Sequence, residues 1–179
     1  MTNIRIIEQS LQSLSSEQTY LYSTADLRAL MPNLSEEAFK SLIHRLCKVG
    51  PLRRLVKDIF LYSPVPISHG DILFHVASKL RDYHFNYLSL ETVLSRAGMI
   101  SQVPVQWISL MSSGRSYTIT VKGFGTIEFV HTKKRPSQVM KYLHYDHDLR
   151  LWVGDTDLAI QDMKHTHRNM GLVNKHEFI

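Results

Sequence analysis

The sequence is poor in the features that would tie it to a membrane or an oxidising compartment. Cysteine occurs once, at Cys47, so no disulfide can form within the chain. No apolar run approaches the ~20 residues needed to cross a bilayer. The opening residues, MTNIRIIEQS, contain no apolar signal core. We therefore expect a cytoplasmic protein that has no membrane partner.

The sequence patterns of common catalytic and cofactor-binding sites are also missing. The chain contains no HExxH zinc motif, no GxSxG nucleophile motif and no phosphate-binding P-loop. The GFG segment at 123–125 is too short to cradle a phosphate and is typical of a hairpin turn. Cys47 lies among apolar helix positions, which favours a buried structural thiol over a nucleophile. We expect a protein that is not an enzyme and holds no cofactor.

Histidine, in contrast, is frequent, with ten in the chain. The segments HYDHD (144–148) and HTHRN (165–169), with His176 further on, suggest a metal site. A single cysteine excludes a zinc-finger set, and scattered surface histidines explain the pattern more simply. We expect no bound metal.

What remains is an ordinary globular composition with an excess of positive charge. The 179 residues are 44% hydrophobic and 21% charged, which is too apolar for a disordered chain. This length has room for one medium domain or two small ones. The net charge of +5 and the pI near 9.4 favour polyanionic partners, and the position of the charge is more informative than its total.

Apolar periodicity predicts two helices before residue 32. In IRIIEQSLQSL (4–14) the apolar residues recur at helical spacing. ADLRALM (25–31) follows two candidate caps, Ser23 and Thr24, and Asp26 stands at capping-box spacing from Ser23.

A third helix and a hairpin complete the first part of the chain. Ser35 is suited to cap the third helix, which we expect to end near Val49, before Gly50 and a proline. LRRLV and IFLY (52–62) then predict two short strands joined by a tight turn. Helix, helix, turn, helix and hairpin follow one another as in a winged helix–turn–helix, which we predict for residues 1–65.

The third predicted helix begins with two acids, Glu36 and Glu37, but from Ala38 to Lys57 the sequence contains no acidic residue. Lys40, Ser41, His44, Arg45 and Lys48 lie opposite the apolar stripe. Such a face suits insertion into the major groove of DNA. Lys40 or Arg45 is suited to pair with guanine, and Ser41 or His44 to contact bases or phosphate.

The hairpin extends this positive face. We expect Arg53, Arg54 and Lys57 to neutralise backbone phosphates. The backbone amides at Ser23 and Thr24 are expected to meet one more phosphate. The predicted double-stranded DNA interface comprises Thr24, Lys40, Ser41, His44, Arg45, Lys48, Arg53, Arg54 and Lys57. The alternative is a solvated face on a winged helix that binds another protein.

After a proline-containing linker, SPVPISHG (63–70), we expect a small mixed α/β domain over residues 69–179, so that the whole chain has the α+β class. The predicted helices are DILFHVASKLRDY (71–83), LSLETVLSRAG (88–98, with Ser89 as cap) and DTDLAIQDMKH (155–165). The predicted strands are VQWISLMS (105–112), SYTITVK (116–122), GTIEFVH (125–131) and LRLWVG (149–154).

A second basic cluster, KKRP (133–136) extended by Lys141, follows the third of these strands. By default it forms a surface loop. Alternatively, the cluster extends the DNA footprint or meets an acidic or RNA-like partner.

Four motifs of the second half carry a family resemblance. They are YLSLETVLSRAG (87–98), an arginine between two strands (Arg115), a strand ending in histidine, IEFVH (127–131), and VGDTDLAIQDM (153–163). Together with the order of the predicted elements, these motifs resemble the AbiEi-type antitoxins of type IV toxin–antitoxin systems. In the last motif Ala159 and Asp162 match, whereas Gly154 and Thr156 stand where the family usually has alanine and proline.

The resemblance implies a function that composition alone does not supply. The winged helix would bind inverted repeats in the protein's own promoter, as a homodimer, and repress a bicistronic operon. The second domain would counteract a partner nucleotidyltransferase toxin, with or without direct contact between the two proteins. The alternative is a ligand-responsive winged-helix transcriptional regulator, whose second domain senses a small molecule. An interaction module and a metal-dependent nuclease are further alternatives.

Overall fold

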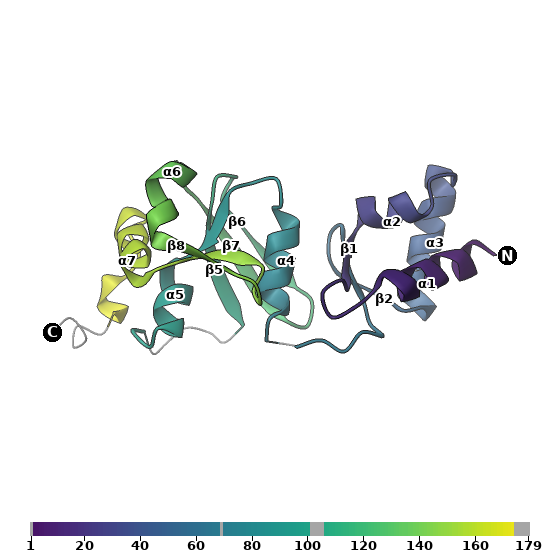
Figure 1. The fold of residues 1–179 in the computed structure, drawn as a ribbon, viewed down its shortest axis with the longest axis horizontal. Helices are drawn as coiled ribbons and strands as arrows, with labels where there is room; N and C mark the ends of the chain where they lie inside the picture. The colour runs from purple at the N-terminus through teal and green to yellow at the C-terminus, as the bar shows by residue number, and fades with distance from the viewer. Residues whose placement is uncertain (1, 69, 101–105, 174–179) are drawn as a thin grey trace. The chain divides into compact units, whose positions relative to one another are not determined.

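The computed structural model describes residues 2–68, 70–100 and 106–173 and divides the chain into two compact units. We call Met1–His69 the N-terminal unit and Gly70–Ile179 the C-terminal unit, and we describe each by itself. The mixture of helices and strands confirms the predicted α+β class (Figure 1). Within the described residues, no helix combines the length and apolar composition of a membrane span.

The N-terminal unit contains, in chain order, α1 (Asn3–Leu14), β1 (Leu21–Ser23), α2 (Thr24–Leu30), α3 (Glu36–Val49), β2 (Leu52–Val56) and β3 (Ile59–Tyr62). The helices and the hairpin agree with the sequence prediction to within one or two residues. The predicted capping box is present, because the Asp26 amide donates to the Ser23 hydroxyl at 3.0 Å and the Ser23 amide donates to the Asp26 carboxylate at 2.7 Å. The hydroxyl of Ser35 caps α3 by accepting from the Ala38 amide.

The short strand β1 was not predicted from the sequence. It pairs antiparallel with β3, and β3 pairs antiparallel with β2, so that the described residues form a three-stranded sheet in the order β1-β3-β2. At the β2–β3 turn, Asp58 has a φ of 65°, a left-handed conformation that aspartate adopts more readily than most residues. The sheet holds the start of α2 beside this turn.

One apolar core unites the helices and the sheet of the N-terminal unit. It contains one face of α1 and of α3, together with side chains from α2 and the strands: Ile7, Leu11, Tyr22, Leu27, Met31, Phe39, Leu42, Ile43, Leu46, Leu52, Phe60 and Tyr62. Because α3 buries its apolar stripe here, its polar stripe is turned to solvent.

The C-terminal unit contains α4 (Ile72–Leu80), β4 (Asn86–Leu88), α5 (Leu90–Arg96), β5 (Trp107–Ser112), β6 (Tyr117–Val121), β7 (Gly125–His131), α6 (Pro136–Val139), η1 (Met140–Tyr142), β8 (Leu143–Asp146), β9 (Leu151–Gly154), α7 (Thr156–His165) and η2 (Met170–Leu172). All the helices and strands predicted for this half are present among the described residues; position 105, the first of the predicted strand 105–112, lies outside them. The short elements β4, α6 and β8 were missed, together with the two 3-10 turns.

The described strands of this unit form a mixed six-stranded sheet in the order β6-β7-β5-β4-β9-β8. The β7–β5 and β4–β9 pairs are parallel, and the other pairs are antiparallel. Figure 1 shows α4 on one side of this sheet and α5 and α7 on the other, where the last two helices pack against each other. Residues that are distant in sequence therefore meet on the α5–α7 side.

Candidate functional site

The polar stripe of α3 is exposed along its whole length. The five side chains predicted there are all solvent-exposed: Lys40, Ser41, His44, Arg45 and Lys48. Phe39, Leu42, Ile43 and Leu46 on the opposite stripe are buried. The helix therefore presents cations and hydrogen-bond donors outward, as the periodicity predicted.

The hairpin after α3 adds three more exposed cations. Arg53 and Arg54 are exposed on β2, and Lys57 is exposed in the β2–β3 turn. The guanidinium carbon of Arg54 lies 5.8 Å from the centre of the Phe60 ring, a cation–π contact that orients the side chain along the sheet.

A cavity of about 430 Å³ brings part of the predicted interface together. Its lining includes Thr24, Lys40, His44 and Arg54, from α2, α3 and β2. The remaining predicted residues, Ser41, Arg45, Lys48, Arg53 and Lys57, are outside this lining.

Two acids also line the cavity, Glu36 and Asp58. Glu36 forms an ion pair of 3.2 Å with Lys40, and the two side chains are 59% and 72% exposed. Such an exposed pair contributes only about 0.3–0.5 kcal/mol, so it leaves Lys40 able to exchange partners. The predicted DNA interface is therefore basic overall, with an acidic side chain at the start of α3.

The expectation that Thr24 offers its amide to a phosphate is wrong. The Thr24 amide donates to the backbone carbonyl of Asp58 at 3.0 Å, and the Thr24 hydroxyl donates to the Asp58 carboxylate at 3.0 Å. The Ser23 amide is used by the capping box. These donors fasten α2 to the hairpin turn instead of meeting a ligand.

Cys47 lies at the edge of the same cavity. Burial raises the pKa of its thiol, and the charge of Arg54 lowers the pKa by a smaller amount. The thiol is half-buried and favours its protonated form, as expected of a structural cysteine.

In the C-terminal unit, three donors converge on one buried carboxylate. Asp162 on α7 is 0% exposed. It accepts hydrogen bonds from the Tyr87 hydroxyl at 3.0 Å and the Ser89 hydroxyl at 2.7 Å. The ammonium of Lys134 forms an ion pair with its other oxygen at 2.6 Å. Burial and the neighbouring carboxylate raise the pKa of the Tyr87 phenol, which therefore stays protonated as a donor.

This arrangement corrects the role expected for Ser89. Its side chain makes no capping hydrogen bond to α5 and points to Asp162 instead. The next residue, Leu90, has a φ of 57°, which turns the chain sharply from β4 into α5. Such a conformation is strained for leucine and is held by its complete burial.

A second polar group lies on the same side of the sheet. The Arg168 guanidinium contacts Glu128 at 2.6 Å and Glu91 at 3.3 Å. Glu128 also accepts from the buried Ser109 hydroxyl at 2.8 Å. These pairs join α5, the sheet and the segment after α7, so we assign them a structural role.

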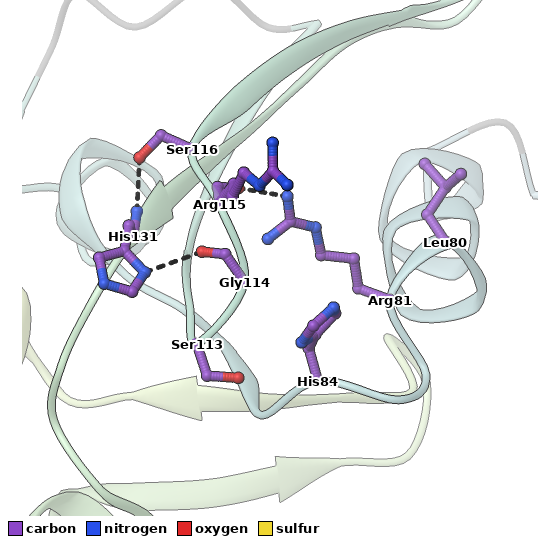
Figure 2. Close-up of a pocket in the computed structure, with 8 residues that line it drawn as sticks. All are labelled: Leu80, Arg81, His84, Ser113, Gly114, Arg115, Ser116 and His131. Carbon is purple, nitrogen blue, oxygen red and sulfur yellow. Dashed lines mark hydrogen bonds between the residues drawn. The ribbon is translucent and has the colours of Figure 1, made fainter.

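A large cavity of the C-terminal unit lies at the end of α4. We call it the Arg81 pocket; its volume is about 810 Å³ and it is lined by Leu80, Arg81, His84, Ser113, Gly114, Arg115, Ser116 and His131 (Figure 2). Figure 2 shows the Arg81 side chain reaching from the end of α4 to the β5–β6 turn that carries Arg115. Arg115 and His131, both named by the family resemblance, thus lie in one site.

The metal hypothesis finds no support in the described part of the chain. Within residues 2–68, 70–100 and 106–173, no three histidine, cysteine or acidic side chains gather as a metal site. His176, the last member of the histidine segments, lies outside the described residues.

The residues of the basic KKRP cluster differ in their surroundings: one forms a partly buried ion pair and others are exposed. Lys134 is committed to Asp162, whereas Lys133 and Arg135 are exposed. Lys141 lies over the ring of Tyr142, 4.6 Å from its centre.

Sequence reasoning missed Arg81 and His84, since neither belongs to a motif. Arg81 falls within a predicted helix, where an arginine is usually a solvated surface residue. The nearest signal was the glycine of the SSGR turn (112–115). A Cβ at Gly114 would lie 2.4 Å from an Arg81 nitrogen, so any larger residue at this turn would displace the guanidinium from its observed position.

Comparison with protein-family models finds no match for the chain, and comparison with curated proteins finds none either.

Proposed function

We propose that residues 1–65 form a winged helix–turn–helix that binds duplex DNA. The order α1, β1, α2, α3, β2, β3 and the antiparallel sheet β1-β3-β2 support this proposal. In it, α3 is the recognition helix that enters the major groove, and the β2–β3 hairpin is the wing that follows the backbone.

The observation that carries the proposal is the exposed positive surface on consecutive elements. Eight predicted interface residues are exposed on α3 and the hairpin: Lys40, Ser41, His44, Arg45, Lys48, Arg53, Arg54 and Lys57. Six of them are lysine or arginine. Cations on a helix and on an adjacent ribbon can neutralise phosphates on both sides of one groove.

The two parts of this surface have different roles. Arg45 is exposed on α3 and has the planar fork that pairs with the two acceptors of guanine. Arg53 and Arg54 project from the hairpin, where contacts to phosphate give affinity without sequence preference. We propose that two protomers bind paired half-sites related by two-fold symmetry.

Salt-dependent DNA binding tests the wing assignment. Changing Arg53 and Arg54 together to alanine removes two phosphate contacts. The slope of log K against log salt should then become shallower by up to about 1.8, about 0.9 for each contact. The matched control is the double change of Lys122 and Lys164, exposed cations of the C-terminal unit, to alanine. An Arg53/Arg54 variant with the wild-type affinity and slope would show that the hairpin does not touch DNA.

We further propose, on the strength of the resemblance, that the protein is an antitoxin and autorepressor. It would repress its own operon through the N-terminal unit and counteract a nucleotidyltransferase toxin through the C-terminal unit. The test is co-expression with the adjacent gene. Relief of growth arrest is expected from the full chain, from the Arg53/Arg54 variant and from residues 69–179. Arrest that persists with the full chain would overturn the antitoxin role.

The alternative function is a ligand-responsive regulator, which the Arg81 pocket favours. A neighbouring nucleotidyltransferase gene supports the antitoxin. A change in promoter affinity when a small molecule is added supports the regulator.

A further inference from the structure

We infer that the Arg81 pocket binds the phosphate group of a small molecule of nucleotide size. The inference goes beyond the proposed DNA binding, because all the residues that carry it belong to the C-terminal unit.

The first argument is the unbalanced charge of Arg81. Its side chain is buried, with the residue only 7% exposed. One guanidinium nitrogen donates to the Ser112 hydroxyl at 2.7 Å and another to the backbone carbonyl of Arg115. The guanidinium lies 4.6 Å from the ring centre of Tyr117 and 4.4 Å from that of Phe129.

All these partners are neutral. Within the described residues, Arg81 forms no ion pair with a carboxylate. A buried cation that lacks a counter-charge is costly, and a bound anion supplies one.

The second argument is the chemistry of the other lining residues. Arg115 and His84 are exposed at the pocket and make no side-chain hydrogen bond or ion pair within the described residues. Among the described residues that line the pocket, none is acidic. Asp82, the residue after Arg81, is exposed and lines an adjoining, smaller cavity of about 280 Å³, which Arg81 and His84 also line. The pocket therefore offers two guanidinium groups and an imidazole to one ligand, which is a donor set suited to phosphate.

Two serine hydroxyls complete this donor set. The Ser113 hydroxyl accepts from the Phe85 amide at 3.2 Å, and the Ser116 hydroxyl accepts from the His131 amide at 2.8 Å. Because each oxygen already accepts a backbone hydrogen, its own proton is available to a phosphate oxygen.

The third argument is that the pocket is held in shape without a ligand. The side-chain amide of Asn86 donates to the backbone carbonyls of Arg81 and His84, at 2.7 Å each, and fixes the turn between them. The His131 ring is held by a 2.9 Å hydrogen bond between its Nδ1 and the Gly114 carbonyl (Figure 2). Fixed donors bind with a smaller entropic cost than mobile surface lysines.

The form of the site favours a small molecule over a nucleic-acid backbone. Its volume of about 810 Å³ lies in the range of small-ligand sites, about 300–1,000 Å³. Backbone phosphates are usually met by a row of exposed cations along a surface, whereas these donors converge within one cavity.

The test is isothermal titration calorimetry of the full chain with pyrophosphate and with ATP, at fixed salt. The key variant is Arg115→Gln, because this side chain is exposed and its replacement should leave the fold intact. Loss of a charge-assisted hydrogen bond should weaken binding by about 10- to 100-fold. Arg115→Lys keeps the positive charge but loses the planar guanidinium, so its affinity for the probes should lie between those of the wild type and Arg115→Gln.

Two controls separate this result from general charge effects. Lys164→Gln removes one exposed cation of the same unit from outside the pocket and should keep the wild-type affinity. The Arg53/Arg54 variant should also bind the probes normally, so failure of the DNA proposal and failure of this one are distinguishable.

Three outcomes would overturn the inference. The first is the absence of binding heat with either probe at about 1 mM. The second is equal affinity of the wild type and Arg115→Gln for the probes. The third is that the protein binds neither probe but binds a short oligonucleotide in a manner that depends on Arg115. The last outcome would assign the pocket to nucleic acid.

Discussion

Ser89 and Asp162 lie 73 residues apart in sequence, and the Ser89 hydroxyl donates a 2.7 Å hydrogen bond to the Asp162 carboxylate. This contact joins the β4–α5 turn to α7. Because Tyr87 and Lys134 share the same carboxylate, this aspartate of α7 connects its helix to two other segments of the C-terminal unit. Ser89 lies in one motif of the family resemblance (87–98) and Asp162 in another (153–163), and the structure gives their connection.

Removing this carboxylate should destabilise the C-terminal unit strongly. We expect Asp162→Ala to lower the free energy of unfolding by about 3 kcal/mol, because it leaves two hydroxyls and an ammonium without their acceptor. Ser89→Ala should cost about 1–2 kcal/mol. Urea unfolding followed by tryptophan fluorescence measures this unit alone, since both tryptophans, Trp107 and Trp152, belong to it.

A double-mutant cycle then tests whether Ser89 acts through Asp162. The coupling energy should lie at about 0.5–3 kcal/mol for contacting residues. Ser137→Ala, an exposed serine of α6, should change stability by less than about 0.5 kcal/mol. Additive effects of Ser89→Ala and Asp162→Ala would contradict the assigned hydrogen bond.

The two candidate base-reading residues should behave differently. Arg45 is exposed and forms no ion pair or side-chain hydrogen bond within the described residues, whereas Lys40 is held beside Glu36. We expect Arg45→Ala to change the preference at one base position by about 1–3 kcal/mol. Lys40→Ala should weaken binding to all sequences alike. Binding to a randomised DNA library measures both effects, and a uniform loss for Arg45→Ala would make it a phosphate contact.

Neutralising Glu36 should strengthen DNA binding. Glu36→Gln removes an acid from the edge of the positive surface and releases Lys40 from its ion pair. The expected gain is about threefold for specific and random DNA, corresponding to ~0.6 kcal/mol. The charge-matched control is Asp157→Asn, an exposed acid of α7, which should leave affinity unchanged. Fluorescence anisotropy at low salt measures the gain. Unchanged affinity would place Glu36 away from DNA, and a loss of affinity would mean that its ion pair with Lys40 favours binding.

The N-terminal fold was largely predictable because its signals are local. The apolar period of α3, the cap at Ser35 and the stop at Gly50 all act within a few residues. The strand β1 was missed because it is three residues long and exists through its pairing with β3. The predicted phosphate contact of the Thr24 amide failed for the same reason, since the partner of Thr24, Asp58, lies 34 residues further along the chain.

In the C-terminal unit, sequence patterns predicted the longer elements but not the polar contacts between them. Its longer helices and strands follow from periodicity, but its two polar centres depend on contacts across the sheet. Lys134 belongs to a cluster that charge patterning interprets as a surface loop, yet it forms an ion pair with a fully buried aspartate. Arg81 has no motif at all, and its burial follows from the rings of Tyr117 and Phe129 that enclose it.

His75 should make the stability of the C-terminal unit sensitive to acid. Burial lowers the pKa of this imidazole. The hydrogen bond between its Nε2 and the Asp148 carbonyl raises the pKa in part, and the charge of Arg150 lowers it further. Asp71 and Asp148 raise the pKa by smaller amounts. The unfolded chain therefore binds a proton at His75 more readily than the folded chain. The stabilising contribution is complete above about pH 6.5, the ordinary value, and is lost as the pH falls from there through the lower folded-state pKa.

Replacing His75 should remove this acid-induced loss of stability. His75→Gln keeps a hydrogen-bond donor but cannot titrate, so its free energy of unfolding should fall less than that of the wild type between about pH 7.5 and 5. His144→Gln, an exposed histidine of β8, should keep the wild-type pH profile. Urea unfolding monitored by the two tryptophans at each pH measures the difference. Parallel profiles for the wild type and His75→Gln would mean that the buried imidazole charges as easily in the folded unit as in water.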